Sequence, residues 1–247
     1  MYWRIFKYIQ HLFHFRKRKG HGIHSPYQFE FINRVLFNSD GREVPPAILK
    51  EHRRMKRDKT LLPCGSVRAF VLNSSVSEKY ASLLYRISQW FHPDMILELG
   101  TGLGISTIYL SAGSPETPLH SIEGNMERAA YAAQVLCRCC PGPVSIHWGD
   151  MDLKLEDILP LLPPRFLAFV DGNHQYEPTI AYVRLLVDRA GDEAVIVMDD
   201  IYWSKGMFRA WTELISWPEV RVSINLFHTG ILLLRKDLYK TNYKIKF

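Results

Sequence analysis

The sequence predicts an α/β fold with a mostly parallel sheet and helices on both faces. From Asp94 onward, short apolar runs of strand length alternate with segments of helical periodicity, which is typical of repeated βαβ units. The first run ends in a glycine-rich turn that opens a helix. Two last runs flank His228-Thr229-Gly230, and this spacing predicts an antiparallel hairpin near the C-terminus.

Each expected strand is a short apolar run, and each expected helix repeats its apolar residues every three or four positions. The expected strands are residues 95–99, 119–123, 144–148, 165–170, 194–198, 220–227 and 231–235. The expected helices are residues 77–91, 105–112, 126–138, 152–159, 177–190 and 208–216. Because helices connect the first five strands, those strands are expected to run parallel.

A basic, mainly helical extension precedes this pattern. The predicted division is residues 1–74 for the extension and residues 75–247 for the main domain. Residues 3–15 set aromatic and aliphatic side chains among basic ones, which predicts an amphipathic helix that docks on its own domain, on a partner or on a membrane surface. Ser25 and Pro26 suit the N-cap and first position of a second helix. Residues 40–75 form no interpretable pattern.

Composition limits the class of protein. A chain of 247 residues, 47% of them hydrophobic, buries a sizeable core. No apolar stretch reaches 18 residues, so we expect no transmembrane helix, and the first 15 residues lack the features of a signal peptide. Of the four cysteines, Cys137, Cys139 and Cys140 crowd the end of one expected helix, and Cys64 stands alone. This argues against a zinc site and indicates reduced thiols in a cytoplasmic protein.

Positive charge is concentrated near the N-terminus. Residues 1–60 hold 14 Lys/Arg and 5 Asp/Glu, a net charge of +9, whereas the whole chain carries +6. Two basic runs, at residues 16–19 and 53–57, contribute much of it. Such runs are either a solvated surface or the contact for an anionic partner such as RNA, a nucleotide-linked substrate or an acidic membrane.

The turn after the first strand is the most informative segment, because Gly100, Gly102 and Gly104 fall at every second position. Glycines there permit positive φ and the close approach of a ligand. The third glycine is out of register with the dinucleotide pattern G-x-G-x-x-G. Glu98 would repel a pyrophosphate, but it can accept hydrogen bonds from an ammonium group or ribose hydroxyls. The turn therefore favours a cationic nucleoside without phosphates over NAD.

Further acidic residues end the next two strands. Glu123 lies one strand–helix–strand unit after Glu98, the separation expected of an acidic ribose ligand. Asp150 ends the third strand, in Gly149-Asp150-Met151. Either acid alone is more often a solvated loop residue, but acids that end three successive strands indicate one binding site.

The pattern E-x-G-x-G-x-G at residues 98–104 resembles the first motif of class I S-adenosylmethionine-dependent methyltransferases. The resemblance implies a Rossmann-like sheet of seven strands with S-adenosylmethionine as the cofactor. It also implies that Asp150 accepts a hydrogen bond from the adenine amino group. Carried onto this chain, the cofactor-binding residues are Glu98, Gly100, Thr101, Gly102, Gly104, Ser106, Glu123, Asp150, Met151 and Asp171.

Acidic residues also end the fourth and fifth strands, at Asp171 and at Asp199-Asp200. Ligands of open α/β sheets bind outside the carboxyl ends of the strands. Three carboxylates there suit Mg²⁺ or another divalent cation, which would lower the pKa of a substrate hydroxyl. His174 is the candidate general base. The alternatives are structural: Asp171 caps a turn, Asp199-Asp200 caps the next helix, or His174 only pairs with a carboxylate.

The motif D-G-x-H-x-Y at residues 171–176, followed by D-D at 199–200, resembles small-molecule O-methyltransferases. It is similar to the catechol and caffeoyl-coenzyme A types and to metal-dependent antibiotic and sugar O-methyltransferases, over roughly residues 75–235. The resemblance implies Asp171, Asp199 and Asp200 as metal ligands, and His174 and Asp171 are the candidate catalytic residues. The chain departs from the catechol type, which has Asp-Asn at residues 199–200, and its N-terminal region has no identified counterpart.

We therefore expect methyl transfer to a hydroxyl of a small molecule, assisted by a divalent cation. Tyr202 and Trp203 are candidates for an aromatic wall, whereas Trp211 suits the core. The alternatives are an RNA methyltransferase that uses the basic N-terminal region, and a non-catalytic module that keeps the cofactor fold. The glycine register disfavours an NAD-dependent oxidoreductase. A docked N-terminal helix would suit a homodimer.

Overall fold

The computed structural model describes residues 2–13, 23 and 25–247 of the chain. By its internal contacts the chain divides into two compact units, Met1–Phe37 with Leu162–Phe247, and Asn38–Leu161. We call them the C-terminal unit and the glycine-turn unit. The expected domain boundary at residue 75 stays a prediction.

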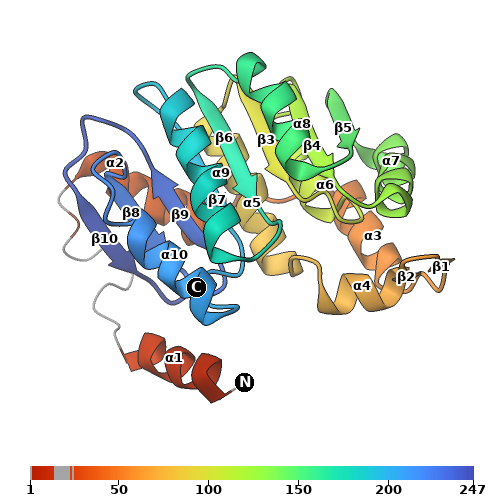
Figure 1. Ribbon diagram of the computed structural model, residues 1–247, viewed down its shortest axis with the longest axis horizontal. Helices are drawn as coiled ribbons and strands as arrows, with labels where there is room; N and C mark the ends of the chain where they lie inside the picture. Colours follow the sequence, from red (N-terminus) through yellow and green to blue (C-terminus); the bar gives the residue numbers. More distant parts are fainter. Residues whose placement is uncertain (1, 14–22, 24) are drawn as a thin grey trace. The chain divides into compact units, whose positions relative to one another are not determined.

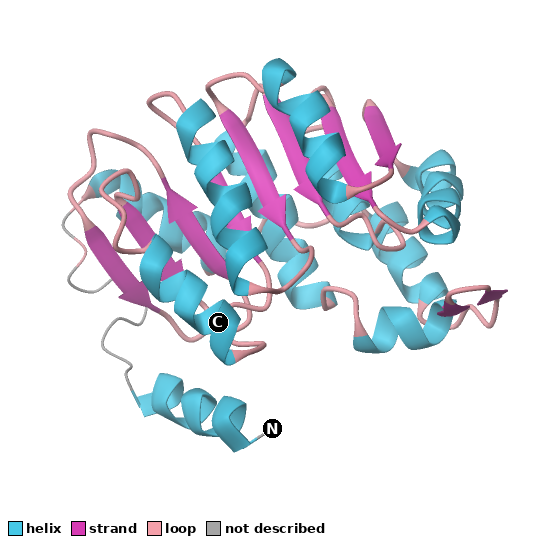
Figure 2. Cartoon of the chain, viewed as in Figure 1, coloured by secondary structure: helices cyan, strands magenta, loops and turns pink. Residues whose placement is uncertain are grey.

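The glycine-turn unit contains three parallel strands in the order β3-β4-β5, with Leu119 opposite Ile96 and Val144 opposite Leu119. Figure 2 shows α8 in front of these strands and α6 behind them, so helices cover both faces. The strands are β3 (Met95–Leu99), β4 (Leu119–Glu123) and β5 (Val144–Trp148). The helices are α5 (Glu78–Phe91), α6 (Ile105–Gly113), α7 (Met126–Cys139), α8 (Met151–Ile158) and the 3-10 turn η2 (Leu159–Leu161).

Residues 40–75, which formed no interpretable pattern, pack on α6 and α7. They form α3 (Pro46–Met55), the hairpin β1 (Leu61–Leu62) with β2 (Gly65–Ser66), and α4 (Val67–Asn73). Their buried apolar side chains share one core with those of α6 and α7. The carboxylate of Glu51 on α3 accepts from Arg54 at 2.9 Å and from Arg138 on α7 at 2.8 Å. Polar contacts and a common core thus join α3 to α7.

The C-terminal unit has the strand order β10-β8-β9-β7-β6. β6 (Phe166–Val170) and β7 (Val195–Met198) are parallel, β9 (Gly230–Leu233) is antiparallel to both β7 and β8 (Val222–Asn225), and β10 (Thr241–Lys244) is parallel to β8. Figure 1 shows α9 (Tyr176–Arg189) beside α10 (Lys205–Leu214), and the two helices are in contact. The N-terminal helices of this unit are α1 (Tyr2–Phe13), α2 (Pro26–Glu30) and the π-helix η1 (Phe31–Leu36).

The N-terminal helices dock on their own unit. The Trp3 ring lies 5.7 Å from Phe208 of α10, centroid to centroid, and the Tyr243 hydroxyl of β10 donates to Gln28 of α2 at 2.5 Å. The Ser25 side chain accepts from the Gln28 N–H, which confirms the predicted N-cap. Residues 14–15 of the predicted first helix and the basic run 16–19 lie outside the described residues.

All seven predicted strands and all six predicted helices are present, with ends shifted by a few residues, and the α/β fold class is confirmed. α10 begins at Lys205, before the expected Phe208, because the Ser204 hydroxyl caps it by accepting from the Met207 N–H at 3.0 Å. The sequence analysis missed β10, a short strand with exposed polar residues at the edge of its sheet. Such strands lack the apolar alternation that marks a strand in the sequence.

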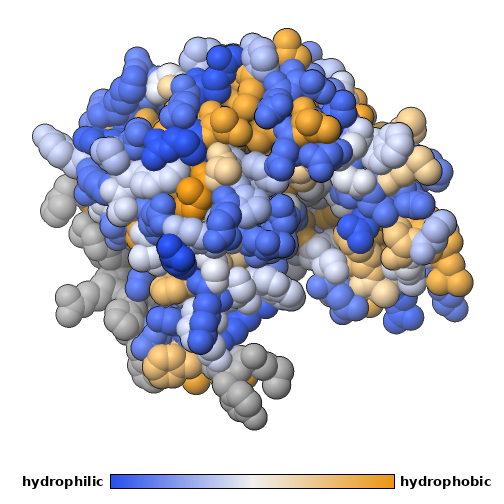
Figure 3. Space-filling view, viewed as in Figure 1, coloured by the Kyte–Doolittle hydropathy of each residue, from blue (hydrophilic) through white to orange (hydrophobic). Residues whose placement is uncertain are grey.

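Hydrophilic residues cover most of the face shown in Figure 3, interrupted by small hydrophobic patches. Within the described part of the chain, no helix has both the length and the apolar character needed to cross a membrane. All four cysteines are free thiols.

Close packing of α5 on α6 fixes the helix that follows the glycine turn. The Ser88 hydroxyl of α5 donates to the Leu110 carbonyl at 2.8 Å, and the Ser114 hydroxyl donates to the Ser88 carbonyl at 2.9 Å. A Cβ added to Gly113 would lie 2.4 Å from the Tyr85 carbonyl oxygen. Only glycine therefore allows this approach of the two helices.

Replacing Gly113 with alanine is expected to destabilise the protein by about 1–3 kcal/mol, because the clashing atoms belong to backbone that cannot rotate away. Gly124→Ala is the matched control, since its added Cβ would have its nearest neighbour at 3.8 Å. Urea unfolding of both variants measures the effect. Equal stability of Gly113→Ala and Gly124→Ala would contradict this account of the α5–α6 contact.

Candidate functional site

The glycine turn lies between β3 and α6, and its backbone requires glycine. Gly100, Gly102 and Gly104 have φ angles of 105°, 55° and 86°, a region that side chains with a Cβ rarely adopt. Packing adds to this requirement. A Cβ on Gly102 would lie 3.2 Å from the Phe70 ring, and one on Gly104 would lie 3.3 Å from Ala132. The turn therefore requires glycine for two reasons: its backbone conformation, and the lack of space for a side chain at Gly102 and Gly104.

Glu98 lies in β3, two residues before the first glycine of the turn, and is fully buried. Its Oε2 accepts from the hydroxyls of Thr107 on α6 and Ser121 on β4, both at 2.6 Å. Its Oε1 is buried and has no hydrogen-bond partner among the described residues. Burial raises the pKa of Glu98, and the surrounding hydroxyls oppose that rise. The side chain thus ties β3 to α6 and β4 and retains one unsatisfied acceptor.

Glu123 connects the end of β4 to the turn. Its Oε2 accepts from the Gly102 N–H at 2.8 Å, and its Oε1 accepts from the Asn125 N–H at 2.9 Å. The carboxylate is 6% exposed and held by backbone on both sides. Each oxygen keeps a further lone pair, so Glu123 can still accept from a ligand hydroxyl.

Asp150 caps a helix in this structure. Its Oδ1 accepts from the N–H groups of Asp152 and Leu153 at 3.0 and 3.3 Å, at the N-terminus of α8, which Met151 begins. This is the structural role that an acidic residue often has at such a position. The expected contact of Asp150 with the adenine amino group, and the role of Met151 in cofactor binding, remain predictions.

Two residues of the glycine-turn unit escaped the sequence analysis. Phe70 of α4 packs against Gly102, and the Arg128 guanidinium of α7 lies 4.7 Å over the Phe70 ring. Neither residue belongs to a motif, and Phe70 comes from the segment without an interpretable pattern. Only the folded chain brings them to the turn.

Asp171 and His174 lie together in the C-terminal unit. Asp171 Oδ1 is 3.4 Å from His174 Nε2. Burial lowers the pKa of His174, and the charge of Asp200 opposes the shift. A neutral imidazole at neutral pH can accept a proton, as a general base must.

The backbone around these residues is strained. Among the described residues, six that are not glycine have positive φ, and four of them follow β6, β7 and β8: Asn173 (62°), His174 (33°), Asp200 (50°) and Phe227 (74°). Such conformations cost about 1–3 kcal/mol each and cluster at functional sites. The loops after these three strands therefore form a candidate site.

Asp199 and Asp200 have different partners. The Thr229 hydroxyl donates to Asp199 Oδ1 at 2.9 Å, and Asp200 Oδ1 accepts from Arg4 of α1 at 3.3 Å. Burial, and then the charge of Asp200, raises the pKa of Asp199 to about 7. Because Ser204 caps the next helix, the alternative in which the two aspartates cap α10 is wrong.

Each of the three predicted metal ligands has a protein partner in this arrangement, and their role as ligands stays a prediction. Asp199 is bonded to Thr229, Asp200 to Arg4, and Asp171 lies at ion-pair distance from His174. In the part of the chain that the structure describes, no group of three or more His, Cys, Asp or Glu side chains is placed to hold a metal ion. A guanidinium lies against Asp200 where a cation was expected.

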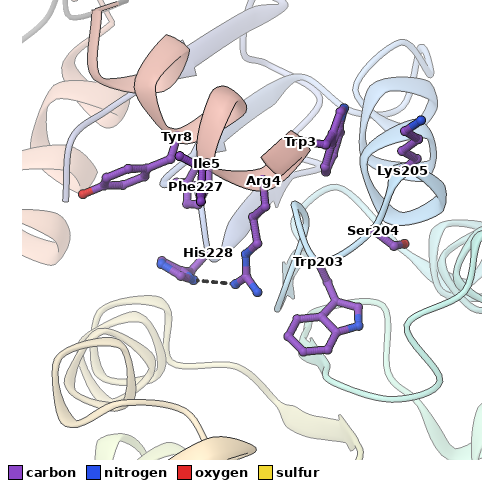
Figure 4. Close-up of a pocket in the computed structure, with 9 residues that line it drawn as sticks. All are labelled: Trp3, Arg4, Ile5, Tyr8, Trp203, Ser204, Lys205, Phe227 and His228. Carbon is purple, nitrogen blue, oxygen red and sulfur yellow. Dashed lines mark hydrogen bonds between the residues drawn. The ribbon is translucent and has the colours of Figure 1, made fainter. Parts of the chain in front are cut away.

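Arg4 and His228 are further site residues that the sequence analysis missed. Figure 4 shows Arg4 reaching from α1 to His228, with Arg4 Nη2 3.3 Å from His228 Nδ1. The Arg4 guanidinium also lies 5.0 Å over the Trp203 ring. Of the aromatic candidates, Trp211 is buried in the core as expected, Tyr202 stacks on Phe227 and is also buried, and Trp203 is 54% exposed.

The pH dependence of stability tests the environment of Asp199. Its pKa is raised in the folded state, so between about pH 4 and pH 7 the folded protein binds more protons than the unfolded chain. The stability contribution present below pH 4 is therefore lost as the pH rises to 7.

Asp199→Asn keeps an oxygen to accept from Thr229 but cannot ionise. Relative to the wild type, we expect the free energy of unfolding of this variant to rise by about 1–3 kcal/mol as the pH increases from 5 to 8. Thermal unfolding at both pH values measures the difference. A difference that does not change with pH would show that Asp199 ionises normally.

Comparisons with known proteins agree with this geometry. Residues 97–201 match the model of a family described as a methyltransferase domain. The structure is similar to the O-methyltransferase from Bacillus cereus in complex with SAH, at 20% identity and a TM-score of 0.63, covering 82% of this chain and 96% of that chain. It is also similar to the O-methyltransferase TomG from Streptomyces achromogenes in complex with SAM, at 23% identity and a TM-score of 0.60, covering 81% and 94%.

A third similar structure is a putative caffeoyl-CoA O-methyltransferase from Staphylococcus aureus, at 14% identity and a TM-score of 0.60, covering 82% of this chain and 99% of that chain. No curated protein matches the sequence. The predicted resemblance to class I S-adenosylmethionine-dependent methyltransferases is thus confirmed: residues 97–201 match a methyltransferase domain, and the chain has the Rossmann-like fold of these solved structures.

Proposed function

We propose that this protein transfers a methyl group from S-adenosylmethionine to a hydroxyl of a small molecule. The observation that carries the proposal is the glycine turn with Glu123 bound to the Gly102 N–H, inside the segment that matches a methyltransferase domain. A fixed carboxylate and no nearby phosphate-binding pattern suit a cationic nucleoside.

The residues of the turn fit that cofactor. Glu123 is held with lone pairs that can accept from ribose hydroxyls. The buried Oε1 of Glu98 has no donor within the described residues, and a donor from an ammonium group would remove that cost. The other proposed cofactor-binding residues are Gly100, Thr101, Gly104, Ser106, Asp150, Met151 and Asp171.

When bound, S-adenosylmethionine would supply a methyl group made reactive by its positively charged sulfonium, and the residues of the chain would hold the acceptor hydroxyl and remove its proton. His174 takes the hydroxyl proton, because its lowered pKa keeps the imidazole neutral. Asp171, 3.4 Å away, then stabilises the imidazolium. The chain otherwise contributes by positioning the reactants.

RNA remains the alternative acceptor, and the basic run at residues 53–57 gives it little support. Arg53 pairs with Glu78, and Arg54 pairs with Glu51 and Asp58, so part of the positive charge of α3 is neutralised within the fold.

A non-catalytic module that keeps the cofactor fold is the other alternative. A cytoplasmic location and a homodimer stay predictions.

Glu123→Ala is expected to weaken the binding of S-adenosylmethionine about 10–100-fold, because a charge-assisted hydrogen bond contributes about 1.5–3 kcal/mol. Isothermal titration calorimetry with the full chain measures this change. Glu156→Ala is the control, since it removes an exposed carboxylate from α8 of the same unit. Equal affinity of Glu123→Ala and the control would refute the role of Glu123.

Chelation tests the cation separately. Because Asp199 and Asp200 are already bonded to Thr229 and Arg4, we expect methyl transfer to survive exhaustive treatment with EDTA. Release of S-adenosylhomocysteine measures turnover, with and without added Mg²⁺. Loss of turnover that Mg²⁺ restores would reinstate the predicted metal ligands Asp171, Asp199 and Asp200.

A further inference from the structure

The helix α1 turns its basic side chains toward its own unit. Arg4 Nη2 donates to Asp200 Oδ1 at 3.3 Å, and Figure 4 shows Arg4 reaching from α1 toward the loop after β8. Lys7 Nζ lies 4.6 Å over the Phe208 ring, and His11 Nε2 donates to a backbone carbonyl after β10 at 3.2 Å. Because Arg4, Lys7 and His11 are three and four positions apart, they share one face of the helix. That face docks on the protein.

Another face of α1 is apolar and exposed. Ile5, Phe6 and Ile9 are three or four positions from one another or adjacent, so they lie together on it. Their exposed fractions are 49%, 57% and 45%. Figure 3 shows hydrophobic residues over this helix, at the lower edge of the view. We call these three residues the α1 stripe.

The α1 stripe reverses the usual arrangement of a surface helix. Such a helix normally packs its apolar face on the core and turns its charged face to water. Single exposed apolar residues are common, but several that adjoin one another mark a contact with another protein or with a membrane. The proposed function gives the stripe no role, so it is a candidate interaction surface.

Charge indicates which partner fits this surface. Residues 1–29 of the sequence contain six Lys/Arg and no Asp/Glu. A bilayer that contains anionic lipids has a negative surface potential and attracts basic segments. A second copy of the chain would bring two such segments together, and like charges across an interface repel. An anionic membrane surface therefore fits better than a homodimer formed through the stripe.

The length of α1 sets how it can meet a bilayer. It has 12 residues, whereas a helix that spans a bilayer needs about 20. A short helix with basic and aromatic residues and an apolar face lies in the plane of the interface, with that face at the boundary between headgroups and acyl chains. Trp3 and Tyr8 give α1 the aromatic residues typical of such helices.

We propose that the α1 stripe is a membrane-contact surface that binds the headgroup region of a bilayer containing anionic lipids. This inference goes beyond the proposed function and does not depend on it, because methyl transfer requires no membrane. It gives α1 a second role: one face of the helix contacts the loops of its own unit, and the other contacts lipid.

Co-sedimentation of the full-length chain with lipid vesicles tests the proposal. One set of vesicles is phosphatidylcholine alone, and the other is phosphatidylcholine mixed with phosphatidylglycerol. We expect binding to the mixed vesicles that weakens as sodium chloride is added, and weaker binding to the neutral ones. Absence of binding to the mixed vesicles, or equal binding to both sets, would overturn the proposal.

Variants locate the binding in the stripe. Phe6→Ser and Ile9→Ser should each lower the partition coefficient onto mixed vesicles about tenfold, because each removes a large apolar side chain from the contact. Leu153→Ser is the control and should bind as the wild type does, since it removes a 62% exposed leucine from α8. Far-UV circular dichroism checks that each variant keeps the wild-type fold.

Two results with these variants would refute the proposal. Equal binding of the stripe variants and the control would show that charge alone attracts the chain to lipid. Sedimentation velocity without lipid tests the second copy as the partner. A dimer that Phe6→Ser and Ile9→Ser disrupt, in a chain that does not bind vesicles, would show that the stripe is a homodimer interface.

Discussion

The buried carboxylate of Glu98 is the constraint on which the glycine turn depends. It accepts from hydroxyls on α6 and on β4, so one side chain fixes the strand before the turn, the helix after it and the neighbouring strand. Burying a carboxylate is costly unless its oxygens are bonded, and Oε1 is left without a donor among the described residues. The protein maintains this cost beside the turn that is proposed to bind a cationic nucleoside, and a bound ammonium group would relieve it.

In the C-terminal unit, the negative charges of Asp199 and Asp200 are compensated in a different way. Asp199 is partly neutralised by its raised pKa, and Asp200 by the guanidinium of Arg4. Two neighbouring, half-buried carboxylates need such compensation, since like charges repel. A divalent cation is one way to provide it, and a side chain from α1 is another. The structure shows the second, and it makes α1 part of the site instead of a separate extension.

Much of the fold was predictable because its signals are local. Apolar runs and helical periodicity located every strand from β3 to β9, and the glycines located the turn. The order of acids along the chain also indicated Glu98, Glu123 and Asp171. Contacts between distant segments were not predictable. Arg4 meets Asp200 and His228 across about two hundred residues, and Phe70 meets Gly102 from a segment without a pattern. Contacts between residues so far apart in the sequence are determined by tertiary packing, and no pattern of residue spacing predicts them.

The central claim is that the turn accepts a cationic nucleoside and rejects a pyrophosphate. Titration of the wild-type chain with S-adenosylmethionine and with NAD, side by side in the same buffer, tests it most directly. The account predicts saturable binding of S-adenosylmethionine and none of NAD at the same concentrations, because Glu98 and Glu123 are acceptors that attract an ammonium group and ribose hydroxyls but repel phosphates. Comparable affinity for both ligands, or binding of NAD alone, would contradict it.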